Sequence, residues 1–117
     1  MSSNRKTLSL RHPQAEREID AAETVVTHGI AHLLCVRATR NRAEIIFEPH
    51  ILYTQQGERF VDAVVTDYSR DQKRELTTFK LGALKDPVIT AEPFAPMPDF
   101  DHNAPRYSEG VIVRVDR

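Results

Sequence analysis

The hydrophobic pattern of this chain changes at Gly29, and that change constrains the fold more than any other feature of the sequence. Before Gly29, apolar residues recur at steps of three or four along one face of a helix: Ala15, Ile19, Ala22 and Val26. Pro13 suits the first helical turn, where its missing N–H needs no partner. Gly29 suits the position just after the last turn. The pattern predicts a helix over about residues 14–27.

After Gly29 the apolar residues form short runs separated by polar segments, which is typical of strands and turns. We expect strands over 30–38, 44–52, 59–66, 74–81 and 88–94, and a last strand over about 110–116. The turns fall at 39–42, at 55–58 with its glycine, and at 67–73. Prolines at 93, 96, 98 and 105 mark an extended connection before the last strand. One helix followed by six short strands predicts a mainly β protein whose sheet curls into a small barrel.

Length and composition indicate a single globular domain. With 117 residues, 40% hydrophobic and 28% charged, the chain suits one core. We expect a flexible leader over 1–12 and one domain over 13–117. The balance of 16 basic and 17 acidic residues gives a net charge of −1, which provides no overall attraction to nucleic acid or membrane.

Cysteine usage and the N-terminus point to the cytoplasm. Cys35 is the only cysteine, so an internal disulfide is impossible and a reducing compartment is the simpler expectation. The first residues contain no apolar secretion segment, and the longest apolar run, around 30–36, is too short to span a bilayer. We expect a cytoplasmic protein with no membrane contact.

Four segments occur in the order and spacing found in the WYL domain family. They are Glu48-Pro49-His50-Ile51-Leu52-Tyr53, Gly57 with Arg59-Phe60-Val61, Leu76-Thr77-Thr78-Phe79-Lys80-Leu81, and Glu92-Pro93-Phe94. Over about residues 17–101 the chain resembles a WYL domain. The resemblance implies a helix followed by an Sm-like β-barrel, which serves bacterial transcription regulators as a ligand- or nucleic-acid-sensing module and is often dimeric. Because 1–28 is too short for an additional helix-turn-helix, we expect a freestanding WYL-like domain.

The chain departs from the family at its signature positions. Arg59, Phe60 and Val61 stand where the family has Trp, Tyr and Leu, and Thr77 and Ala83 stand where it has arginines. Arginine binds phosphate through a planar fork of donors that threonine and alanine lack. The barrel is expected to tolerate these changes, whereas the family's anion-binding surface is in question.

The candidate binding residues are basic or aromatic side chains of neighbouring strands: Arg59, Phe60, Arg74, Lys80, His50 and Tyr53. The three cations are expected to converge on a phosphate of a nucleotide, another anionic ligand or a nucleic acid, with His50 and Tyr53 at the rim. Exposed strand charges that merely interact with water are the alternative. Phe60 either stacks on a base or belongs to the core. Asp62, on the same strand face as Phe60, would repel phosphate.

Catalytic, metal and cofactor sites are not expected. The chain has no Gly-x-Ser-x-Gly or glycine-rich phosphate motif, and Cys35 lies within an apolar run, where a thiol behaves as a small hydrophobe. His28 and His32 stand four apart, but Gly29 is expected to end the helix that would bring them together.

Two functional hypotheses remain open. The first is a transcription-associated sensor that binds a ligand or nucleic acid and passes its state to a partner regulator or a second copy. The second is a protein-interaction module that has lost ligand binding.

Overall fold

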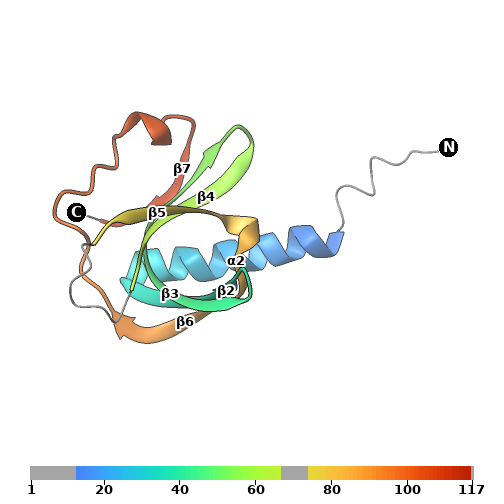
Figure 1. Ribbon diagram of the computed structural model, residues 1–117. Helices are drawn as coiled ribbons and strands as arrows, with labels where there is room; N and C mark the ends of the chain where they lie inside the picture. Colours follow the sequence, from blue (N-terminus) through green and yellow to red (C-terminus); the bar gives the residue numbers. More distant parts are fainter. Residues whose placement is uncertain (1–12, 67–73, 117) are drawn as a thin grey trace.

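The computed structural model describes residues 13–66 and 74–116, which form one long helix and a six-stranded antiparallel sheet (Figure 1). The elements are α2 (Pro13–His32), β2 (Leu34–Arg40), β3 (Ala43–Gln55), β4 (Glu58–Val65), β5 (Leu76–Lys80), η1 (Leu81–Ala83), β6 (Lys85–Pro93), η2 (Pro105–Tyr107) and β7 (Val111–Arg114), where η denotes a 3-10 helix. The predicted class, mainly β with one N-terminal helix, is confirmed. The predicted leader 1–12 and turn 67–73 lie outside the described residues.

The helix α2 begins at Pro13, one residue before the predicted start, but the predicted end before Gly29 is wrong. Gly29 stays within the helix because α2 lies close against the sheet there. A Cβ atom on this residue would lie 2.9 Å from the carbonyl oxygen of Leu34 and 2.9 Å from a methyl carbon of Val36. The helix ends at His32 instead, and Leu33, which follows it, has a left-handed φ of 56°. Packing of the half-buried Leu33 side chain offsets a backbone cost of roughly 1–2 kcal/mol. The first strand consequently starts at 34, not at 30.

The strands pair in the order β5-β4-β3-β2-β6, and β7 pairs with β3. The β2–β3 and β3–β4 turns each contain two consecutive residues with positive φ: Asn41 with Arg42, and Gln56 with Gly57. Such two-residue turns match the twist of antiparallel strands. The sheet is strongly curved (Figure 1). Its edge strands β5 and β6 are not paired with each other in the described part of the chain, so the predicted barrel is not closed. Strand β5 has only five residues, and η1 follows it directly, while β6 pairs with β2.

The 13-residue strand β3 is the centre of the sheet and contains a bulge. Its register with β4 runs from Pro49 opposite Ala63 to Ile51 opposite Asp62, which leaves His50 as the extra residue. A proline has no N–H to donate to the ladder, and a bulge is one of the places where a strand accommodates it. One edge of β3 pairs first with β2 and then, beyond the bulge, with β7.

The core lies between α2 and the sheet. From α2 it includes Ala22, Val26 and Ile30, and from the sheet it includes Val36, Phe47, Val61 and Phe79. The segment after β6 adds three buried aromatic side chains: Phe94, Phe100 and Tyr107. The proline-containing connection is therefore a packed part of the fold. Among the described residues, no helix has the length and apolar character needed to cross a membrane.

Candidate binding surfaces

The predicted site residue Arg59 is paired with the helix. From β4 its guanidinium donates to the carboxylates of Asp20, at 3.0 Å, and Glu23, at 2.5 Å. The hydrogen bond to Asp20 contributes most to raising the pKa of Arg59 above its usual value, and the one to Glu23 comes next. Arg59 therefore links β4 to α2. Its positive charge already has two anionic partners within the protein.

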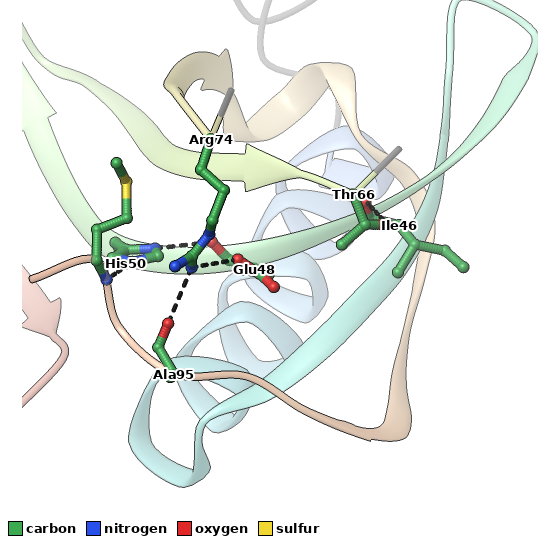
Figure 2. Close-up of polar contacts among 7 residues, drawn as sticks. Ile46, Glu48, His50, Thr66, Arg74 and Ala95 are labelled. Carbon is green, nitrogen blue, oxygen red and sulfur yellow. Dashed lines mark hydrogen bonds and ion pairs between the residues drawn. The ribbon is translucent and has the colours of Figure 1, made fainter. Parts of the chain in front are cut away.

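Arg74 and Lys80 also have carboxylate partners, and each has a different one. The Arg74 guanidinium donates to Glu48 at 2.7 Å and to the carbonyl oxygen of Ala95 at 2.9 Å (Figure 2). Lys80 lies 3.6 Å from a carboxylate oxygen of Glu58. The three predicted cations thus pair with different carboxylates: Arg59 with two on α2, Arg74 with Glu48 and Lys80 with Glu58.

The predicted aromatic and histidine residues lie mostly inside the protein. Tyr53 is 1% exposed and His50 is 0% exposed. Phe60 is half-buried and packs against the core, with its ring stacked on that of Tyr53 at a centroid distance of 5.9 Å. A ligand on the outer surface would reach Phe60 alone among these three side chains.

His50 connects β3 to the segment that follows β6. Its Nε2 accepts the backbone N–H of Met97 at 3.0 Å, so Nδ1 carries the proton and donates to the carbonyl oxygen of Glu48 at 2.9 Å. The ring packs between Phe94 and Phe100, at centroid distances of 5.4 and 5.3 Å. This arrangement fixes one neutral tautomer. His50 therefore holds a structural position within this segment.

Asp62 is a fully buried carboxylate whose four acceptor positions are all used. One oxygen accepts the hydroxyls of Tyr53, at 2.8 Å, and Thr78, at 2.7 Å. The other accepts the Tyr107 hydroxyl at 2.7 Å and the Arg106 guanidinium at 3.0 Å. Burial and the hydrogen bond to Asp62 raise the pKa of Tyr53 to about 12 and also raise the pKa of Tyr107.

Sequence reasoning treated Asp62 only as a charge that would repel phosphate. The donors come from β3, β5 and η2, which are far apart in the chain, so no local pattern marked them. A carboxylate with every lone pair occupied has no acceptor left for a ligand. We therefore interpret this cluster as the attachment of η2 to the sheet.

Three basic residues that sequence reasoning did not single out lie at one end of the sheet. Arg40 ends β2, Arg42 lies in the β2–β3 turn, and Lys85 begins β6 directly opposite Thr39. The Arg40 guanidinium lies 5.0 Å from the centre of the Phe79 ring. None of the three makes an ion pair with a described residue. We call Arg40, Arg42 and Lys85 the turn cluster. Only the local density of arginines around the turn could have indicated it.

A groove adjoins the turn cluster. It has a volume of about 600 Å³ and lies between α2, η1 and the start of β6, with Lys85 on its wall. Its apolar lining includes Ile19, Val25, Leu81 and Leu84, and its acidic lining comprises Glu18 and Asp86. A groove with apolar walls and a basic end suits a ligand that combines an apolar ring with an anionic group.

Other reactive groups are sparse in the described part of the chain. No set of three or more histidine, cysteine, aspartate or glutamate side chains there is placed to hold a metal ion. Cys35 is buried in β2, and burial raises the pKa of its thiol to about 11. A thiol in that state is a poor nucleophile at neutral pH.

Comparison of the chain with family models, with curated proteins and with solved structures finds no match. The resemblance to the WYL domain therefore rests on the residues of the sequence.

Proposed function

We propose that this chain is a non-enzymatic regulatory binding module of the WYL-like type, and that it binds a phosphate-bearing ligand, a nucleotide or single-stranded nucleic acid, at the turn cluster. The observation that carries the proposal is the distribution of positive charge. Arg40, Arg42 and Lys85 have no carboxylate partner among the described residues, whereas the cations of the sequence-predicted site do. A cation without an internal partner gains more from a phosphate, because no existing ion pair has to be given up.

The groove supplies the second half of the binding mode. A phosphate at Lys85 and the adjacent turn would place the rest of the ligand along the apolar walls of Ile19 and Leu84. The carboxylates of Glu18 and Asp86 repel an anion from the remainder of the groove. The ligand is therefore oriented with its phosphate at the turn.

The architecture and cellular role belong to the same proposal. The order of one helix followed by a curved antiparallel sheet supports the proposal, whereas the closed barrel that the resemblance to the WYL domain implies is not formed by the described residues. We assign the fold to the Sm-like class in an open form, in which β5 and β6 do not pair with each other within the described residues. The transcription-associated role is what that resemblance implies, and the cytoplasmic location is proposed from the single cysteine and the short apolar runs of the sequence.

The test is a fluorescence-anisotropy titration of the full-length protein with labelled single-stranded DNA and RNA at two salt concentrations. The triple variant Arg40→Ala/Arg42→Ala/Lys85→Ala is expected to bind at least about 10-fold more weakly. Its affinity should also depend less on salt, with the slope of log K against log salt reduced by roughly 2. Calorimetric titration with nucleoside triphosphates distinguishes a nucleotide from a nucleic acid as the ligand.

The matched control is Arg59→Ala/Arg74→Ala/Lys80→Ala, which removes the same charge from the sequence-predicted site. This variant should bind within about twofold of the wild type. Loss of binding in the control with retention in the turn variant would place the ligand at the sequence-predicted site. Absence of binding to nucleic acid and to nucleotides at low salt would refute the proposal.

A protein-interaction module is the second candidate, and β7 favours it. Val111 and Ile112 are 42% and 41% exposed, which is high for large apolar residues in a strand. Among the described strands, β7 pairs with β3 alone, so its other edge is available to a further strand.

A further inference from the structure

The exposed surface near the end of α2 carries two adjacent histidines. Because α2 continues through Gly29, His28 and His32 lie one helical turn apart on the same helix. Their ring centroids are 4.3 Å apart, with an angle of 37° between the ring planes. Both residues are exposed. The helix end expected from the sequence would have separated them, so the pairing is a result of the tertiary structure.

The nitrogen atoms of both rings are available to a ligand. Neither ring makes a hydrogen bond or ion pair with a described residue. The two rings contact each other. Imidazole nitrogen is a preferred ligand for divalent zinc, copper and nickel. The two rings therefore present unused donor atoms of the type that these ions bind.

The separation of the rings suits chelation. Metal–nitrogen bonds are about 2.0–2.1 Å long, so two nitrogens at neighbouring coordination positions lie roughly 3 Å apart. Rings with centroids 4.3 Å apart reach that distance by rotation of the side chains, without movement of the helix.

The helix beneath the pair is held in place by packing. Val26 and Ile30 are buried at 0% and 1% exposure, and Gly29 lies against β2. A chelate on such an element loses little conformational entropy when the ion binds, because the spacing of the ligands is already set.

We infer that His28 and His32 form a two-histidine binding site for a divalent transition-metal ion such as Zn²⁺ or Ni²⁺. Two imidazoles fill two coordination positions, and water fills the others. The site lies on the exposed face of α2 and does not depend on ligand binding at the turn cluster. Mg²⁺, which prefers oxygen ligands, is not expected to bind there.

The test is isothermal titration calorimetry of the untagged full-length protein with Zn²⁺ and Ni²⁺ in a buffer that does not chelate metals. We expect one ion per chain. His28→Ala and His32→Ala should each weaken binding at least about 10-fold, because each variant loses the second ligand that the helix holds at high local concentration. The ion should also raise the midpoint of thermal unfolding of the wild type by at least about 5 °C at hundredfold excess over Kd.

The matched control is His102→Ala, which removes a histidine of the C-terminal segment. Binding in this variant should stay within about twofold of the wild type. Alanine favours a helix at both exposed α2 positions, so the variants are expected to fold, and circular dichroism checks this. Equal affinity in the wild type and in His28→Ala/His32→Ala would overturn the inference, as would loss of binding in His102→Ala.

Discussion

Asp62 shows how single residues attach the last part of the chain to the sheet. Its carboxylate is fully buried. It accepts hydrogen bonds from the hydroxyl of Tyr53, which precedes it in the chain on β3, and from that of Tyr107, which follows it on η2. A hydrogen bond to a charged group contributes roughly 1.5–3 kcal/mol. The cluster therefore holds η2 in place through a small number of strong contacts.

Tyr53 and Tyr107 make the free energy of unfolding depend on pH in the alkaline range. The pKa of Tyr53 rises from 10.0 to about 12 on folding, mainly through burial, and that of Tyr107 rises too. Between pH 10 and pH 12 the folded state holds more protons than the unfolded state, so the free energy of unfolding falls as pH rises. A difference of about 2 in pKa corresponds to roughly 3 kcal/mol for Tyr53 alone. Urea unfolding at pH 8, 10, 11 and 12 measures this decline.

A variant that lacks the Tyr107 hydroxyl tests whether the fall in the free energy of unfolding above pH 10 arises from the hydrogen bonds to Asp62. Burial also raises the pKa of the Cys35 thiol to about 11, so the series is measured in a Cys35→Ala background. Adding Tyr107→Phe should lower the free energy of unfolding at pH 8 by about 1–3 kcal/mol and make the decline above pH 10 shallower. An unchanged pH profile in this variant would contradict the role given to Tyr107.

At the scale of elements, Gly29 determines how closely α2 approaches the sheet. Glycine within a helix normally costs about 0.5–1 kcal/mol relative to alanine. Here the missing side chain leaves room for the sheet, because a Cβ atom on Gly29 would lie 2.9 Å from atoms of Leu34 and Val36 and 3.2 Å from Pro49. Close packing thus takes precedence over helix propensity at this residue.

We predict that Gly29→Ala destabilises the protein, although alanine is the better helix former. An added methyl group would meet the Leu34 carbonyl oxygen, which is backbone and cannot move aside easily. The expected loss in the free energy of unfolding is about 1–3 kcal/mol, measured by urea denaturation. Gly82→Ala is the control, because its nearest contact would be an ordinary 3.5 Å to Ile19. Equal stabilities of the two variants would show that the approach of α2 is not tight.

For the whole molecule, the open sheet leaves strand edges and apolar side chains at the surface. Val88 on β6 is 44% exposed, and Ile112 on β7 is 41% exposed. The four residues of β7 are suited to antiparallel pairing with the same strand of a second copy, which a two-fold axis would generate. This pairing is the specific form of the protein-interaction candidate that we test.

Sedimentation equilibrium over a range of concentrations is expected to show a reversible dimer of the wild type and a monomer of Ile112→Lys. A lysine at an exposed strand edge disfavours edge-to-edge pairing because its charge would be buried. Its free energy of unfolding should stay within about 0.5 kcal/mol of the wild type, since the position is on the surface. Val88→Lys, on a different edge strand, should dimerise normally. A wild type that remains monomeric throughout would exclude this dimer.

The candidate site was the part that sequence reasoning predicted least well. The strand pattern placed Arg59, Arg74 and Lys80 on neighbouring strands, but it contained no information on which carboxylates would lie beside them. Arg59 pairs with α2, and Arg74 pairs with Glu48 of β3. Ion-pair partners come from elements distant in the chain, so they follow from packing and not from local periodicity.

The sequence by itself determined the class of the fold, because it depends on local patterns. Apolar spacing of three and four predicted a helix from about residue 14, and short apolar runs separated by polar turns predicted the strands. Tertiary structure alone decided three further features: the continuation of α2 past Gly29, the open sheet, and the burial of Asp62. Each depends on how closely distant elements approach, and that distance is set by packing across the whole core.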